Sequence, residues 1–265
     1  MKKLLILSAY LIILFTACES EEIISPDMGY EELLVIQCEL NAYNDFPGVR
    51  VTKTIPVGVP FSIEQAEITD AILYLKINGV QIIPLHYSSQ GLYKPLYNFT
   101  IDIDDTYELF GERNEQTFYA RTIIPKKPIV ISASYNYIDK YAEATVECFN
   151  DEAYSALWVV STGRFVTAEN FYSVSSPVDS DEGEVKVRTS SYPANYQTAA
   201  YNNRRYIQVF AFDSSFEDYF RTSEIGGSID NPYVQGSGNT IWNVKGTKVI
   251  GMFIGVSKSE YIFVN

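Results

Sequence analysis

Short runs of hydrophobic residues recur along most of the chain. In the first half they occupy segments 33–43, 49–57, 71–77 and 80–87, which are rich in Val, Ile, Leu and Tyr. Such runs, separated by turn residues, predict antiparallel strands. Asn78-Gly79 separates the last two, and this dipeptide suits a two-residue turn with positive φ at both positions. The sequence therefore predicts a hairpin over 71–87, and a second hairpin is predicted from 107–110 and 117–124.

The strand pattern resumes in the second half and is interrupted once. The predicted strands are 129–137, 142–149, 156–161, 165–173, 185–188, 206–212 and 249–256. Phe216, Tyr219 and Phe220 are spaced by three and four positions, which is typical of one face of a helix. We therefore expect one short helix over 214–222, capped by a serine at its start.

Two prolines separate the halves. Pro125 and Pro128 remove backbone donors and favour extended structure. We expect an exposed, protease-sensitive linker at 125–128. The predicted fold class is all-β, with two β-sandwich-like modules, residues 30–125 (immunoglobulin-like) and residues 126–265 (β-rich, with the one short helix).

The first residues have the features of an export signal. Lys2 and Lys3 precede a short apolar run, which ends in small residues and Cys18. This arrangement is typical of a bacterial lipoprotein signal. The run is shorter than the ~20 apolar residues of a transmembrane helix. We expect residues 1–17 to be removed and Cys18 to become a lipid-modified amino terminus.

Acidic residues follow Cys18 at Glu19, Glu21 and Glu22. Surface lipoproteins of the Bacteroidota have a similar acidic export tag directly after the lipidated cysteine. The alternative interpretation is a solvated acidic tether without an export role. In either case residues 18–29 are expected to be a tether.

The net negative charge of the chain excludes some classes of partner, and its apolar content excludes general disorder. The chain has a net charge of −13, with 46% hydrophobic and 14% aromatic residues. Loss of Lys2 and Lys3 with the signal leaves 18 basic against 33 acidic side chains, a net charge of −15. A chain with this negative charge repels nucleic acid and anionic lipid head groups. The attached lipid alone is therefore expected to link the protein to the membrane. The apolar content is sufficient for a packed core.

Candidate catalytic and metal-binding residues are few. His86 is the single histidine, which excludes a multi-histidine zinc site, and no nucleophile motif accompanies it. The acidic clusters 102–105 and 179–184 lack the glycine and glutamate positions of a regular calcium loop. An irregular calcium site at 179–184 stays open. We expect no catalytic residue, no metal and no cofactor.

Two cysteines remain after Cys18. Cys38 and Cys148 both lie in apolar strand-like runs, where a free cysteine commonly packs as a small hydrophobic residue. An oxidising envelope would also permit a disulfide between them. The sequence leaves both alternatives open.

An aromatic and polar loop lies between 188 and 206. It contains candidate ligand-binding residues, namely Tyr192, Tyr196, Tyr201, Arg204 and Arg205. Tyrosine with Asn and Arg is typical of binding surfaces, because the rigid ring contributes contact area and keeps a polar tip. Because the chain has 21 tyrosines, packing against the sheets is the alternative interpretation.

Several short motifs together carry a family resemblance. They are the lipobox Cys18, the strand 34–40, the strand 71–75, Gly91-Leu92-Tyr93, the segment 117–125, Tyr219-Phe220, Asn231-Pro232 and the segment 246–255. This order resembles the Bacteroidota surface lipoproteins catalogued as domain of unknown function 4249, over about residues 30–257. The family usually has paired glycines in the late segment, where this chain reads Val244-Lys245-Gly246-Thr247. The resemblance implies an outer-membrane lipoprotein with an immunoglobulin-like first domain, often associated with TonB-dependent receptors.

Two classes of function agree with these features. The first is a non-enzymatic surface binding protein, which captures a ligand or serves as an accessory subunit of a TonB-dependent transporter. The alternative is a structural adhesin or cell-surface assembly subunit. In both cases we expect an outer-membrane protein, lipid-anchored and facing the cell exterior, with no nucleic-acid partner.

Overall fold

The computed structural model describes residues 30–161, 166–168, 170–176, 183–192, 204–223 and 240–264. The chain divides into two units, Met1–Glu31 and Glu32–Asn265. The following description concerns the second unit. Within the described residues, no helix has the length and apolar character needed to cross a membrane.

Strands account for most of the described residues. In the first half they are β1 (Leu34–Asn41), β2 (Val49–Lys53), β3 (Ile72–Ile77), β4 (Gln81–Ser89), β5 (Leu92–Lys94), β6 (Thr106–Arg113) and β7 (Gln116–Ile123). In the second half they are β8 (Ile129–Asn136), β9 (Tyr141–Glu147), β10 (Glu152–Ser161), β11 (Val166–Ala168), β12 (Val174–Ser175), β13 (Glu184–Arg188), β14 (Arg204–Asp213), β15 (Lys245–Gly246), β16 (Val249–Lys258) and β17 (Ile262–Phe263). The helices are α2 (Ile63–Ala66) and α3 (Ser215–Ser223). The all-β prediction and the short helix of the second half are confirmed.

Most strands belong to one large sheet. Its order is β11-β10-β14-β16-β1-β2-β5-β4-β3-β6-β7-β15, with β12 and β17 paired beside this path, and β13-β9-β8 form a second sheet. The predicted hairpin over 71–87 is present as β3 and β4, with φ of 51° at Asn78 and 71° at Gly79. Leu73, Leu75 and Ile77 of β3 are buried and alternate with more exposed residues, as expected for a strand with one face on a core.

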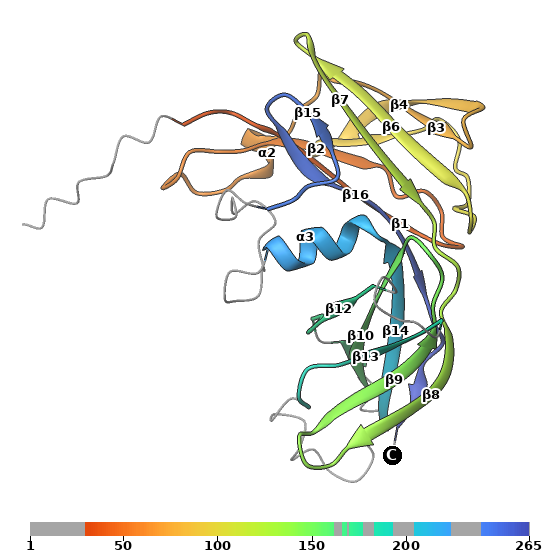
Figure 1. The fold of residues 1–265 in the computed structure, drawn as a ribbon. Helices are drawn as coiled ribbons and strands as arrows, with labels where there is room; N and C mark the ends of the chain where they lie inside the picture. Colours follow the sequence, from red (N-terminus) through yellow and green to blue (C-terminus); the bar gives the residue numbers. More distant parts are fainter. Residues whose placement is uncertain are drawn as a thin grey trace, which may run out of the picture. The chain divides into compact units, whose positions relative to one another are not determined.

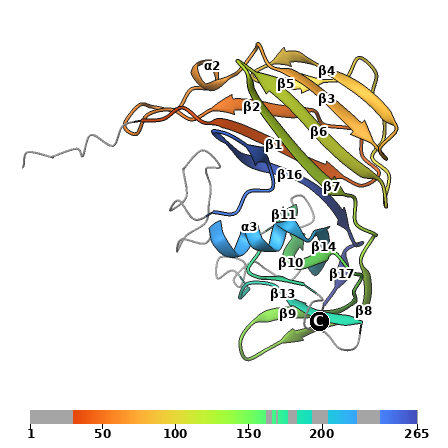
Figure 2. The ribbon, with the colours of Figure 1, turned by 45° about the horizontal axis from the view of Figure 1, so that its top comes forward.

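Strand β16 joins the two halves of the chain. It runs parallel to β1, from Leu34 opposite Val249 to Asn41 opposite Val256, and its end pairs antiparallel with β14. Figures 1 and 2 show β16 beside β1 in both views. At Gly251 a Cβ atom would lie 1.9 Å from the carbonyl oxygen of Ile36, so only glycine permits this approach. The close approach of β16 to β1 therefore explains why position 251 is a glycine.

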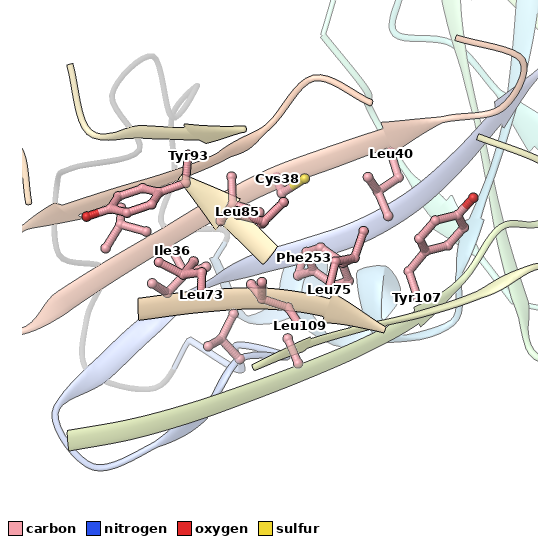
Figure 3. Close-up of a cluster of buried hydrophobic side chains, with 14 of the residues drawn as sticks. Ile36, Cys38, Leu40, Leu73, Leu75, Leu85, Tyr93, Tyr107, Leu109 and Phe253 are labelled. Atoms are coloured by element: carbon pink, nitrogen blue, oxygen red, sulfur yellow. The ribbon is translucent and has the colours of Figure 1, made fainter. Parts of the chain in front are cut away.

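Two main hydrophobic cores lie in the two halves. The first gathers side chains of β1, β3, β6 and β7 with Tyr93 of β5 and Phe253 of β16. Figure 3 shows the labelled members of this core, which come from strands distant in the sequence. The second surrounds Trp158, which is fully buried, with residues of β9, β13 and β14. A smaller cluster contains Ile254 and Val256, so β16 contributes to clusters on both of its faces.

Residues 125–128, which the sequence predicted to be an exposed linker, are exposed only at Lys126 and Lys127. Pro125 and Pro128 are buried. The Lys126 N–H donates to the Glu152 carboxylate at 2.9 Å, and the Ser257 hydroxyl donates to the Lys126 carbonyl at 2.6 Å. The physical reason is the return of β16, which packs beside this segment. The boundary between modules 30–125 and 126–265 stays a prediction, and the first module takes Phe253 of its core from the second.

Candidate functional site

An apolar hollow borders the open part of β4. β5 pairs with β4 only from His86 to Ser89, and after Lys94 the chain leaves the sheet. Between residues 81–86 and segment 95–99 lies a hollow of about 380 Å³. Ligand pockets commonly have volumes of roughly 300–1,000 Å³ and mostly apolar walls. The hollow has the size of a site for a small ligand.

Pro84 agrees with the finding that, among the described residues, no strand pairs with this part of the β4 edge. It pairs with Tyr74 of β3 on one side and lies in the stretch of β4 that β5 leaves unpaired. Proline has no N–H to donate and is tolerated in strands chiefly at edges. Pro84 therefore weakens this edge as a template for a further strand. A ligand here would bind through apolar contacts more than through backbone hydrogen bonds.

The floor of the hollow is held by the fold. Phe99 stacks on Phe46, with ring centroids 5.0 Å apart and planes at 17°, and the Phe46 N–H donates to the Phe99 carbonyl at 2.9 Å. Phe46 belongs to the first core, and Ile83 packs against it. The hollow is therefore anchored to a rigid part of the molecule.

The rim of the hollow exposes apolar side chains to solvent. Ile82, Leu96 and Tyr97 are 62%, 76% and 83% exposed. Removing such surfaces from water stabilises a complex by about 25 cal/mol per Å². The polar side-chain groups in the lining are the amides of Gln81 and Asn98, the imidazole of His86 and the hydroxyl of Tyr97. Because no carboxylate, lysine or arginine is among these described lining residues, the site favours an uncharged ligand.

A second, more polar hollow lies beside the start of α3. It has a volume of about 600 Å³, and Arg121, Lys245, Trp242 and Asp218 are among its lining residues. Asp213, which also lines it, caps α3 by accepting from the Ser215 N–H at 3.1 Å, and it accepts from the Ile123 N–H at 3.0 Å. Ser214 directly precedes the helix, and Asp213 satisfies the first N–H of α3. Asp213 fixes the helix to β7, so its role in this hollow is structural.

Glu152 is a buried carboxylate near the junction of the halves. Its oxygens accept from the Lys126 N–H and from the Tyr154 hydroxyl. Burial raises the pKa of Glu152 above its ordinary value, although these two hydrogen bonds act in the opposite direction. Burial and the adjacent Glu152 also raise the pKa of Tyr154. The group holds segment 125–128 against β10.

The aromatic loop is described only in part, and its described side chains pack. Tyr192 is 5% exposed, and its ring lies 5.2 Å from Trp158 in an edge-to-face arrangement. The Arg205 guanidinium lies over the rings of Tyr135 and Tyr192, at 5.2 and 5.0 Å from their centroids. The prediction that Tyr192 contacts a ligand is therefore corrected: Tyr192 is a core residue, because its ring is buried against Trp158. Tyr196, Tyr201 and the side chain of Arg204 lie outside the described residues.

The structure describes some of the other predicted site residues and not others. Cys18, Glu19, Glu21 and Glu22 lie outside the described residues, as do residues 179–182 of the second acidic cluster. Asp105 of the first cluster accepts from the Asn78 side chain at 2.7 Å, which fixes a turn. Within the described part of the chain no group of three or more metal-ligating side chains is found.

No disulfide joins Cys38 and Cys148, so the disulfide alternative is not realised. Cys38 is a member of the first core, whereas Cys148 packs against the second. Burial raises the pKa of the Cys38 thiol far above its ordinary value. The buried thiol is therefore neutral and behaves as a small hydrophobic residue.

No protein-family model and no curated protein sequence matches this chain. The resemblance to domain of unknown function 4249 therefore stays a prediction.

Proposed function

We propose that this protein is a non-enzymatic binding protein of the outer membrane, anchored through lipid on Cys18 and displayed on the cell exterior. The observation that carries the binding role is the apolar hollow at the β4 edge, with its rigid floor and exposed apolar rim. Exposed apolar groups gathered around a preformed hollow mark a site of interaction. The ligand that fits this hollow is small, uncharged and largely apolar.

The proposed partner is a TonB-dependent receptor, for which this protein serves as an accessory ligand-capturing subunit. The support is the lipoprotein signal and acidic tag of the sequence together with the family resemblance. A pull-down of the lipidated protein from detergent-solubilised membranes, followed by mass spectrometry, tests the partnership. We expect an outer-membrane barrel to copurify. Recovery of host-matrix proteins without a barrel would favour the adhesin alternative.

The lipid anchor and the surface location are tested separately from the partner. Cys18→Ala should abolish incorporation of labelled fatty acid, because the predicted lipoprotein signal places the lipid on this cysteine. Replacement of Glu21 and Glu22 by Ala should reduce cleavage of the protein by protease added to whole cells. Complete protection of the unmodified protein in intact cells would refute surface display.

A further inference from the structure

The loop between β2 and α2 exposes an unbroken run of apolar residues. Residues 56–61 read Pro-Val-Gly-Val-Pro-Phe, and every one of them is exposed to solvent. Val57, at the tip, is 100% exposed. Among the described residues no other exposed run is as long, and the shorter run 137–140 contains Asp139 and Lys140. Consecutive exposed apolar residues are unfavourable in water and mark a contact surface.

The fold holds this loop in a defined turn. Gly58 has a φ of 87°, and the Val59 N–H donates to the Pro56 carbonyl at 3.2 Å. A turn with positive φ at its third residue requires glycine or asparagine there. Beyond the loop, Ala66 of α2 is buried, which fixes the far end. The turn therefore holds Val57 in solvent, away from the core.

The loop lies beside the point where the chain enters β1. The Leu33 N–H donates to the Thr54 hydroxyl at 3.0 Å, and the Thr54 N–H donates to the Leu33 carbonyl at 2.9 Å. Figures 1 and 2 show the loop that precedes α2 on the side from which the chain enters β1. Since Thr54 precedes the loop by two residues, the entry point and the loop share one side of the molecule.

The length of the expected tether keeps this side near the bilayer. Residues 18–29, which would join the lipid on Cys18 to the entry point, are twelve in number. A flexible chain of that length spans about 20 Å, and even full extension gives only about 40 Å. The lipid therefore holds the bilayer at a high effective concentration around the loop, so a small contact area is sufficient for binding.

We propose that loop 56–61 inserts into the surface of the bilayer that carries the Cys18 lipid, and that this second contact orients the protein on the membrane. The inference rests on the lipid anchor of the proposed function. Apolar side chains enter the boundary between head groups and acyl chains without the help of basic residues. The contact is therefore compatible with the net charge of −13, which disfavours electrostatic adhesion alone.

The charged neighbours of the loop limit the depth of this contact. Glu32 is paired with Lys53 and Arg113, at 3.0 and 3.4 Å, so these three charges partly compensate one another. Glu64 follows the loop and is exposed. Interfacial elements reach about 5–10 Å into the boundary of the acyl region. The tip of the turn would occupy that layer, while Glu64 stays among the hydrated head groups.

Fluorescence of the full lipidated protein in phosphatidylcholine vesicles tests the proposal. Val57→Cys, in a Cys148→Ser background, is labelled with the environment-sensitive fluorophore NBD, while the buried Cys38 stays unlabelled in the folded chain. We expect the emission to shift to shorter wavelength on the vesicles, and nitroxide-labelled lipids at the depth of the loop to quench about half of it or more. Val80→Cys is the matched control: Val80 is 84% exposed at the β3–β4 turn and should show neither change.

Val59→Asp with Phe61→Asp, added to the labelled Val57→Cys chain, should abolish both signals, because the new charges stay in water. If this pair fails to fold as judged by circular dichroism, Val59→Ser with Phe61→Ser replaces it and should weaken both signals. Flotation of the vesicles measures the anchor independently of the loop. A floating protein whose label at position 57 stays in water would overturn the loop contact and leave the anchor standing, whereas a chain without acylated Cys18 would overturn both.

Discussion

The two main cores place their aromatic side chains differently. In the second core Trp158 lies between Tyr135 and Tyr192, at 5.7 and 5.2 Å between ring centroids, and Arg205 covers both tyrosines. Beside the first core, Tyr97 remains 83% exposed at the rim of the apolar hollow. The comparison teaches that tyrosines selected by their density in the sequence can belong to a packed core, whereas a tyrosine beside an open strand edge can stay exposed at the rim of a hollow.

The largest effect is expected at the centre of the second core. Trp158→Ala should lower the free energy of unfolding by about 3–5 kcal/mol, because it removes the largest fully buried side chain. It also leaves the Ser190 carbonyl without the indole N–H that donates to it at 2.9 Å. Urea unfolding followed by circular dichroism measures the loss. A change below about 1 kcal/mol would mean that this core is not closely packed.

Tyr192→Ala should have the next largest effect, a loss of about 2–4 kcal/mol, since the ring is buried against Trp158. Tyr192→Phe retains the edge-to-face contact and should lose less. The Ala variant, once folded, should bind a ligand of the hollow as the unmodified protein does. An unchanged melting temperature together with a loss of partner binding would show that Tyr192 belongs to the binding surface and not to the core.

A pH effect is expected at Glu152. The folded pKa is raised above the ordinary value of 4.5, so the native state holds this proton more tightly than the unfolded chain does. Stability from this group is therefore greatest below pH 4.5 and declines as pH rises through the folded pKa. Glu152→Gln removes this titration. The unfolding free energy of both proteins is measured from pH 4 to 8. As pH rises, the unmodified protein should lose stability relative to Glu152→Gln. A relative gain in stability would contradict the raised pKa.

The smallest effect on stability is expected at the rim of the hollow. Ile82→Gln and Leu96→Gln should change the free energy of unfolding by no more than about 0.5 kcal/mol, because both side chains are mostly exposed. Thermal melts of the two variants provide the measurement. A much larger loss would show that the rim is part of the packed core.

Local features were the most predictable from sequence. Asn78-Gly79 gave the β3–β4 hairpin, and the spacing of Phe216, Tyr219 and Phe220 gave α3, because turn chemistry and helical periodicity act between near neighbours. The parallel pairing of β1 with β16 joins residues more than 200 positions apart and has no local signal. That pairing brings β16 beside segment 125–128, where Ser257 donates to the Lys126 carbonyl and Pro125 and Pro128 are buried.

The site was less predictable than the fold. Tyr192 was selected by residue type, but its burial depends on Trp158, which is distant in sequence. The hollow had a weak signal in Pro84 within a strand run, since proline marks an unpaired edge. The apolar residues Leu96 and Tyr97 follow Pro95, yet only the turn away from β4 after Lys94 makes them a rim.

The central claim is that the hollow at the β4 edge, and not the aromatic loop, is the ligand site. Its most direct test is fluorescence titration of the neutral apolar probe N-phenyl-1-naphthylamine into the non-lipidated Cys18→Ala chain without residues 1–17. Saturable binding should weaken about tenfold or more in Ile82→Gln with Leu96→Gln, because contacts worth about 1.5–3 kcal/mol each are lost. Val80→Gln on the same hairpin, and Tyr196→Ala with Tyr201→Ala, should leave it unchanged. Binding that survives the hollow variants but is lost in the tyrosine pair would contradict the claim.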